Sequence, residues 1–382
     1  MPFHFDTTEF ATRQSTAREA LQSEGLDALL IFAPESQYWL CGYDTFGYAM
    51  FQCLVLSATG DLHLLTRLPD LRQAQQSSTL PHDHIHVWAE HEGANPANAL
   101  RDLLTDLGLA NKTLGYESRT AGLTDFNGRL LRAALPELRD TSDLIPALRR
   151  VKSPAEIAMH RRAAALSDDA LDAALDITRA GAFEGTILAA MQGAVFRGGG
   201  DYSGNEFILG SGDSALLCRS HSGRRHLDVN DQLTIEWSGA YARYHAAMMR
   251  TLVIGPPTAA QTAMFEACHE AIVACETSIR PGAPMGDVYE AHAQVFDSHG
   301  LNHARLQACG YGMGAVFPPI WVDFPMFYEG NPMIMQAGQV FFLHMILMDS
   351  DAGHAMCLGH SVLVGETGVE RLSRHDPQML IH

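Results

Sequence analysis

The sequence predicts an α+β protein of two domains, and three observations lead to this prediction. First, the chain has 382 residues, which is enough for two domains at ~150 residues each. Second, residues 1–140 alternate short apolar runs with amphipathic stretches, as in a small α/β domain. Third, the remainder runs in the order helices, strands, helices, strands, which favours helices packed on a mostly antiparallel sheet. We place the two domains at residues 1–148 and 149–382.

Apolar runs predict three strands in the first domain. One run spans residues 26–32, and two more span residues 52–56 and 62–65, joined by the turn Thr59-Gly60-Asp61. Amphipathic stretches predict three helices, at residues 8–24, 95–108 and 122–135.

Two helix start signals organise the second domain. Ser153-Pro154-Ala155-Glu156 is a capping box with proline at the first helical position, and its helix is expected to end near Gly181. Thr258-Ala259-Ala260-Gln261 starts a second helix, which is expected to stop at Arg280-Pro281-Gly282. Strand-like runs and one glycine-rich turn fill the rest: strands at residues 207–209, 233–237, 248–254, 339–348 and 361–364, and the turn at residues 310–314.

The composition limits which binding partners and which cellular compartment we expect for this protein. The net charge of −18 repels phosphate backbones and anionic lipid, so we expect neither nucleic acid nor membrane as a partner. No stretch reaches the ~18 apolar residues that a membrane helix needs, and the N-terminus has no signal-peptide pattern. The seven cysteines are scattered without a CxxC pair, which indicates reduced thiols rather than disulfides or a zinc knuckle. We therefore expect a cytoplasmic protein with a small-molecule substrate.

The second domain carries five short motifs in a fixed order: residues 149–157 (RRVKSPAEI), 231–236 (DQLTIE), 244–251 (YHAAMMRT), 310–314 (GYGMG) and 336–341 (QAGQVF). In this order and spacing they resemble the creatinase, aminopeptidase P and methionine aminopeptidase superfamily, the pita-bread hydrolases. The resemblance covers residues 149 to about 368 and, loosely, the first domain through residues 38–44. It implies a C-terminal pita-bread domain preceded by a creatinase-type N-terminal domain.

The resemblance also shows where this chain departs from the superfamily. Its metalloenzymes use two aspartates, one histidine and two glutamates, and the matching positions here are Glu236, Ala247, Tyr311, His344 and Gly359. Two of these residues have no ligand atom, whereas a dinuclear site needs about five donors. We therefore expect no metallopeptidase chemistry, no metal and no cofactor. One alternative stays open, a single metal held by Glu236, His245, His344 and His360.

The metal-free relatives in this superfamily are creatinase and ectoine hydrolase. Resemblance to them implies a metal-independent hydrolase of a C–N bond, in an amidine, cyclic amidine or amide of a small charged solute. The catalytic histidine of creatinase is matched by His221, and its guanidinium-binding carboxylates by Met249 and His344, which disfavours creatine itself. The segments 236–245, 310–312 and 318–321 look like ectoine hydrolase.

The resemblance assigns four catalytic candidates. His221 relays protons, Glu236 holds the cationic part of the substrate, and Tyr311 or His344 polarises the developing charge. Each has a simpler interpretation as well. His221 lies in a polar, arginine-rich run and could be a solvated loop residue, Glu236 could face water or pair with Arg243 or Arg250, and His344 could be a hydrogen-bonded core residue. The substrate-binding candidates are Tyr48, Gln52, His245, Trp321 and His360.

Relatives in this group are homodimers in which the N-terminal domain of one subunit covers the site of the other. By this resemblance Tyr48, Phe51 or Gln52 reaches the partner's pocket. Two other functions stay open at this point. One is an Xaa-Pro peptidase, which requires metal, and the other is a non-catalytic small-molecule-binding protein on the same scaffold.

Overall fold

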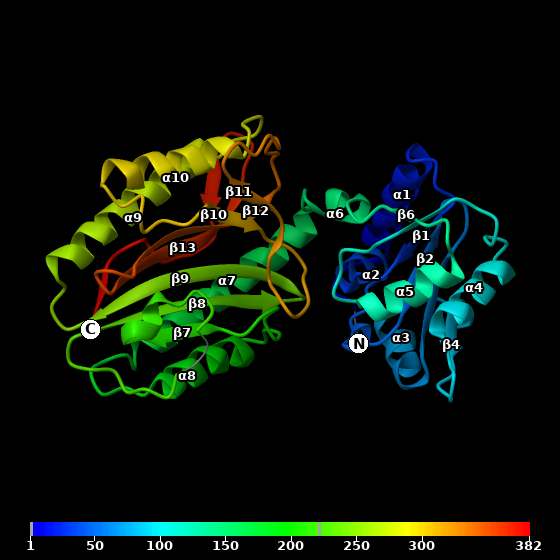
Figure 1. Ribbon diagram of the computed structural model, residues 1–382, viewed down its shortest axis with the longest axis horizontal. Helices are drawn as coiled ribbons and strands as arrows, with labels where there is room; N and C mark the ends of the chain where they lie inside the picture. Colours follow the sequence, from blue (N-terminus) through cyan, green and yellow to red (C-terminus); the bar gives the residue numbers. More distant parts are fainter. Residues whose placement is uncertain (1–2, 221–222) are drawn as a thin grey trace. The chain divides into compact units, whose positions relative to one another are not determined.

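The structure is a computed structural model that describes residues 3–220 and 223–382. The chain divides into two compact units, Met1–Arg149 and Arg150–His382, which Figure 1 shows as ribbons. Among the described residues, none of the helices combines the length and the apolar composition that crossing a membrane requires. All seven cysteines lie in the described part of the chain, and all are free thiols.

The N-terminal unit is a mixed six-stranded sheet with helices on both faces. The sheet has the order β4-β3-β2-β1-β5-β6, in which β2 runs antiparallel to its neighbours and the remaining pairs are parallel. The strands are β1 (Ala28–Ile31), β2 (Cys53–Ser57), β3 (Leu62–Arg67), β4 (Ile85–Trp88), β5 (Leu114–Tyr116) and β6 (Arg139–Asp140). The helices are α1 (Thr7–Ser23), α2 (Pro34–Cys41), α3 (Leu71–Ser77), α4 (Pro96–Asp106), α5 (Asp125–Ala134) and α6 (Leu144–Arg149).

Strand β1 explains why this sheet is covered on both faces. Successive side chains of a strand point to opposite sides, and every residue of β1 is buried. Leu29 and Ile31 pack with apolar residues of α1, α2 and α6. Ala28 and Leu30 pack with leucines of α4 and α5. A continuous apolar run, rather than an alternating one, is typical of such a two-sided strand.

The C-terminal unit is built on a nine-stranded sheet. Its main path is β11-β10-β12-β13-β9-β8-β7, with β14 on β13 and β15 on β9. The strands are β7 (Ile208–Ser211), β8 (Asp231–Tyr241), β9 (Tyr244–Ile254), β10 (Ala308–Gly312), β11 (Asp323–Tyr328), β12 (Val340–Asp349), β13 (His354–Val364), β14 (Val369–Arg371) and β15 (Leu380–Ile381). Every pair is antiparallel except β15 with β9.

Four helices cover this sheet: α7 (Pro154–Leu175), α8 (Glu184–Arg197), α9 (Ala259–Ser278) and α10 (Gly286–Ser298). Helix α7 packs on β8, β9 and α8, while α9 packs on β12, β13 and α10 (Figure 1). Helices on a mostly antiparallel sheet are the predicted α+β arrangement, so the predicted fold class is confirmed.

Two local predictions need correction. Helix α7 ends at Leu175 rather than near Gly181, and a turn follows in which the Thr178 amide and hydroxyl both bond the Ala174 carbonyl. The predicted glycine-rich turn is strand β10, since residues 310–312 pair with residues 341–343 of β12. Both predicted capping boxes are present, at Ser153 and at Thr258.

Candidate active site

One row of residues crosses four strands of the C-terminal sheet and unites two predicted site residues. Glu236 of β8 lies opposite Met249 of β9, Met249 opposite Gly359 of β13, and Gly359 opposite His344 of β12. Directly opposed residues of antiparallel strands project to the same side of the sheet. The Glu236 and His344 side chains therefore share one face.

Tyr311 joins the same face from β10. It pairs with Phe342, which is two residues from His344 and so points the same way. The Tyr311 ring centroid lies 5.3 Å from that of Phe342 and 5.6 Å from that of His344. Ala247 also belongs to this face, being two residues from Met249. The register thus places the predicted catalytic carboxylate, tyrosine and histidine together.

Glu236 is a buried carboxyl group with few hydrogen bonds. Its residue is 6% exposed, and its described hydrogen-bond donor is the Tyr311 hydroxyl, 3.4 Å from Oε1. Burial raises the pKa of Glu236 to about 7, against opposing effects of the Arg219 charge and the Tyr311 hydrogen bond. A carboxyl group with this pKa exchanges its proton near neutral pH, which suits acid–base work or the binding of a cation.

The simpler pairing of Glu236 with an arginine of its own hairpin does not occur. Arg250 lies opposite Ile235, so it points to the other face of the sheet, where its Nη1 donates to the carbonyls of Met249 and Gly359. Arg243 lies at the hairpin turn, with its guanidinium 4.8 Å from the Phe317 ring centroid.

Tyr311 connects Glu236 to Trp321. The Trp321 indole Nε1 donates to the Tyr311 hydroxyl at 2.7 Å. Burial, together with the Glu236 charge, raises the pKa of Tyr311 well above its ordinary value. The phenol therefore stays protonated near neutral pH and can donate a hydrogen bond.

His344 supplies a neutral imidazole to the site. Burial lowers the pKa of His344 to about 4, and the Arg219 charge adds to the effect. Its Nδ1 is buried without a hydrogen-bond partner among the described residues. A buried, unpaired ring nitrogen is costly unless a ligand or water bonds to it, so His344 is equipped to meet a substrate atom.

The donor set at this face does not fit a pair of metal ions. Of the five positions that carry ligands in the superfamily's metalloenzymes, Ala247 and Gly359 offer no donor atom and Tyr311 offers a protonated phenol. One carboxylate and one imidazole remain, too few to balance two divalent cations. Within residues 3–220 and 223–382, no cluster of three or more His, Cys, Asp or Glu side chains has a metal-binding arrangement.

His221, the predicted proton relay, lies outside the described residues, so its placement stays a prediction. Its described neighbour Arg219 is a residue that the sequence reasoning missed. The charge of Arg219 lowers the pKa of both Glu236 and His344, so its positive charge acts on both groups. The one available signal was its position in the same polar run as His221.

The structure places two other predicted ligands away from Glu236. His360 is adjacent to Gly359 in sequence and so points to the opposite face, where its Nε2 lies 2.6 Å from a carboxylate oxygen of Glu276 in α9. His245 lies near the hairpin turn with both ring nitrogens bonded to backbone, Nδ1 to the Arg243 carbonyl at 2.7 Å and Nε2 to the Gly204 amide at 2.8 Å. Neither imidazole is available to complete a mononuclear metal site with Glu236.

Tyr48 and Gln52 belong to the N-terminal unit and are buried within it, at 6% and 1% exposure. The Gln52 amide donates to Oε1 of Gln37 at 2.7 Å, and the Tyr48 ring lies 6.1 Å from that of Phe46. Their predicted role in a partner's pocket stays a prediction.

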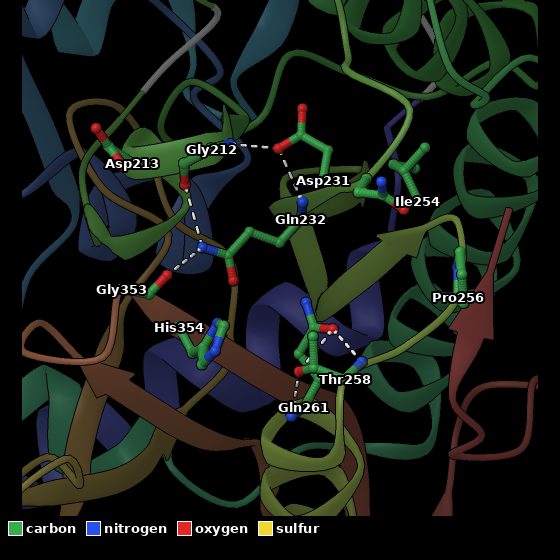
Figure 2. A pocket seen from close by; sticks show the side chains of 11 residues that line it. Gly212, Asp213, Asp231, Gln232, Ile254, Pro256, Thr258, Gln261, Gly353 and His354 are labelled. Atoms are coloured by element: carbon green, nitrogen blue, oxygen red, sulfur yellow. Dashed lines mark hydrogen bonds between the residues drawn. The ribbon is translucent and has the colours of Figure 1, made fainter.

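A separate polar pocket of about 260 Å³ lies at the start of β8 and of α9 (Figure 2). Its polar groups bond to one another. The Asp231 carboxylate accepts from the amides of Gly212 and Gln232, and the Gln232 side chain donates to the carbonyl of Gly353 at 2.8 Å. Its lining includes no predicted site residue, so we assign the chemistry to the face that carries Glu236.

Comparisons with known proteins agree with the predicted superfamily. The model of metallopeptidase family M24 matches residues 158–366, and that of the creatinase/prolidase N-terminal domain matches residues 13–151. An ectoine hydrolase from Halomonas elongata is 26% identical over 99% of this chain and 98% of its own length. An Xaa-Pro dipeptidase from Pyrococcus furiosus is 21% identical over 70% of this chain and 76% of its own length.

Solved structures show the same fold over the whole chain. The dipeptidase PepE from Mycobacterium ulcerans has a TM-score of 0.86 at 23% identity, covering 99% of both chains. An Xaa-Pro dipeptidase from Bacillus anthracis has a TM-score of 0.85 at 18% identity, covering 98% of this chain and 100% of its own. Together with the two family models, these structures confirm the predicted superfamily and its two-domain arrangement.

Proposed function

Because the chain belongs to metallopeptidase family M24, with relatives named as hydrolases and peptidases, we propose that it cleaves a C–N bond in a small charged solute. The bond is that of an amidine, a cyclic amidine or an amide. The reaction uses side chains of this chain in place of the family's metal ions. An alignment along nearly the full length of an ectoine hydrolase supports this substrate class.

The observation that carries the proposal is the state of Glu236. Glu236 is a buried carboxyl group with a pKa of about 7, one long hydrogen bond and no ion pair within 4 Å among the described residues; the Arg219 charge acts on it without forming such a pair. An amidinium or ammonium group placed against it supplies that charge and favours the carboxylate. Only a cationic ligand gains free energy from pairing with the Glu236 carboxylate, so the site selects cationic ligands over neutral ones.

Arg219 extends the recognition to a second charge. Its positive field reaches Glu236 and His344, so a solute carboxylate beside Arg219 and a solute cation against Glu236 would both be stabilised. A zwitterionic amidine or guanidino acid carries these two groups. An apolar or purely anionic solute does not.

The chemical step follows from the neutral and charged groups of the site. Water attacks the electron-poor carbon as His221 accepts its proton, and a C–O bond forms. The neutral His344 imidazole stabilises the charge that shifts in the tetrahedral intermediate, while the Tyr311 hydroxyl donates to Glu236 and supports its carboxylate form. His221 then returns the proton to the leaving nitrogen as the C–N bond breaks.

Xaa-Pro peptidase activity is the second candidate, favoured by the names of several relatives and structural neighbours. In the superfamily it depends on the five-ligand centre. Here Glu236 and His344 are the two remaining donors of that set, which argues against it.

By the same resemblance we propose a homodimer in which the N-terminal unit of one subunit covers the site of the other. The N-terminal unit carries exposed large apolar side chains that such a contact would bury, including Phe46 at 78%, Leu68 at 67% and Met50 at 44% exposure. Light scattering on the purified full chain measures the oligomeric state.

Product detection by mass spectrometry tests the function. The substrate panel comprises ectoine, hydroxyectoine, creatine, guanidino acids, N-acyl amino acids and Xaa-Pro dipeptides, each with chelator and with added manganese. We expect hydrolysis of a zwitterionic amidine in the chelator arm, and its loss in Glu236→Gln. Cleavage confined to Xaa-Pro dipeptides with manganese would overturn the proposal.

A further inference from the structure

The hydrogen-bond chain that reaches Glu236 has a fixed direction, and Trp321 sets it. An indole N–H can only donate, and here it donates to the Tyr311 oxygen at 2.7 Å. A phenol has a single proton, and with its oxygen accepting from Trp321 that proton is directed to Glu236 Oε1, 3.4 Å away. The opposite direction, with a protonated Glu236 donating to Tyr311, would place a second donor on the same oxygen.

The two donors in this series of hydrogen bonds, Trp321 and Tyr311, are both held in place. Trp321 is 2% exposed and Tyr311 is 6% exposed, so water does not compete freely for their bonds. The Trp321 backbone amide donates to the Asn205 side chain at 3.1 Å, and the Tyr311 ring packs edge-on against Phe342. A rigid donor pair of this kind keeps its hydrogen-bond direction without reorganisation during a reaction.

We propose that Trp321 is a positioning residue that acts through Tyr311, directing the phenol proton to Glu236 and keeping the carboxylate form of Glu236 populated near neutral pH. A hydrogen bond to the charged form of an acid favours that form, and here it adds to the larger effect of the Arg219 charge on the pKa of Glu236. The effect on turnover rests on the proposed function, since it requires Glu236 to act as a carboxylate. The effect on the titration of Glu236 does not.

The test compares two tryptophan replacements. Trp321→Phe keeps an aromatic ring and removes the N–H. Trp237→Phe is the matched control, because Trp237 is equally buried and its indole donates to the Ser167 carbonyl at 2.9 Å, on the other face of the sheet. Each variant costs one buried indole hydrogen bond, so similar melting temperatures show similar structural damage.

The readout is the titration of glutamate carboxyl groups by ¹³C NMR in the full chain without substrate. The Glu236 signal is assigned by its absence in Glu236→Gln, and Glu117 serves as an internal reference in the other unit. We expect Trp321→Phe to raise the Glu236 midpoint by about 0.5–1 pH unit. Trp237→Phe leaves it unchanged, and neither variant moves Glu117.

A double-mutant cycle separates positioning from packing. Tyr311→Phe raises the Glu236 midpoint at least as far as Trp321→Phe, and adding Trp321→Phe to it produces no further change. An unchanged midpoint in Trp321→Phe, or an equal shift with and without Tyr311, overturns the inference. If the wild-type chain turns over a substrate, the acid limb of its kcat/KM profile moves with the midpoint. Absence of turnover refutes the proposed function and leaves the titration result intact.

Discussion

Each unit of the molecule contains one deeply buried glutamate whose pKa burial raises to about 7, Glu117 in the N-terminal unit and Glu236 in the C-terminal unit. Their exposures are 2% and 6%. Their hydrogen bonds differ. From the described residues the Glu236 carboxyl receives one bond, at 3.4 Å. The Glu117 carboxyl receives three, at 3.1, 2.9 and 2.6 Å, from the amides of Phe32 and Ala33 and the hydroxyl of Ser36.

The comparison teaches that a shifted pKa alone does not identify a site. The Glu117 carboxyl accepts from the backbone amides of Phe32 and Ala33, which come just before α2 and need an acceptor, so it completes the local structure. Glu236 has a similar pKa, and the described part of the chain leaves most of its acceptor capacity unused. The unused capacity, rather than the titration, marks Glu236 as the group that a ligand completes.

Glu236→Gln gives the largest expected effect. The replacement keeps the shape and removes the charge, so a cationic substrate loses its counter-ion. We expect kcat/KM to fall by about 10²–10⁴-fold, with KM raised as well as kcat lowered. Steady-state kinetics on the substrate found in the panel measure both. Glu117→Gln is the control and should retain wild-type kinetics; equal losses in the two variants would erase the distinction between the two carboxyl groups.

His221→Ala is expected to act on turnover alone. A proton relay contributes in the transition state, so kcat should fall by about 10²–10⁴-fold while KM changes little. The same assay measures it. A His221→Ala variant with near wild-type kcat would show that the histidine is a solvated loop residue and would leave Glu236 without its proposed partner.

Glu117→Ala should destabilise the protein without a kinetic signature. It leaves two amides and one hydroxyl unpaired in the core, at a cost of about 3–5 kcal/mol in the free energy of unfolding. Urea denaturation followed by circular dichroism measures the loss. Glu236→Ala leaves only the Tyr311 hydroxyl without its described acceptor, so it should lower the free energy of unfolding by less. The reverse ranking would show that Glu236 is the structural member of the pair.

The two glutamates should make the stability of the protein depend on pH in the same direction and over the same pH range. Both have folded pKa values of about 7 against an ordinary value of 4.5. Between these values the folded chain keeps a proton that the unfolded chain has released, so the free energy of unfolding falls as pH rises and levels off above about 7. Each group accounts for about 2–4 kcal/mol of this fall.

Replacing either glutamate with glutamine removes its share of the fall in the free energy of unfolding with pH. The two replacements therefore show how much each glutamate contributes. Glu236→Gln should melt at a higher temperature than wild type at pH 8 and at about the same temperature at pH 5. Calorimetry at a series of pH values measures this. Glu117→Gln should show a smaller gain, because an amide cannot accept all three hydrogen bonds. A Glu236→Gln variant that is less stable at pH 8 would mean that the carboxylate has a counter-ion within the protein.

Much of the fold could be predicted from the sequence where local signals were strong. Helices α7 and α9 begin at capping boxes and were found, whereas α8 and α10 begin without a side-chain cap and were missed. Strand β10 was interpreted as a turn because its glycines hide the strand pattern. Its pairing with β12 depends on residues about thirty positions away, which no local rule contains.

The site could be predicted only as far as the alternation of side chains along each strand, between the two faces of the sheet, was known. Glu236 and His344 share a face because of a register across four strands, and the family motifs carried that information. Gly359 and His360 are neighbours in sequence yet point to opposite faces, so His360 was grouped with residues that it does not meet. The bond from Trp321 to Tyr311 joins a loop to a strand, and it required the tertiary structure.

Chelation should produce the smallest effect of all, which is none. A metal ion bound to the folded chain at a hundred times its Kd would add about 2.7 kcal/mol of stability, and stripping it would lower both activity and melting temperature. With Ala247 and Gly359 at two ligand positions, Glu236 and His344 alone cannot hold such an ion against a strong chelator. Overnight chelation should therefore leave kcat/KM and the melting temperature at their starting values. Activity that disappears and then returns with manganese or zinc would make Glu236 a metal ligand. The unused acceptor capacity that separates it from Glu117 would then belong to a metal ion rather than to a cationic substrate.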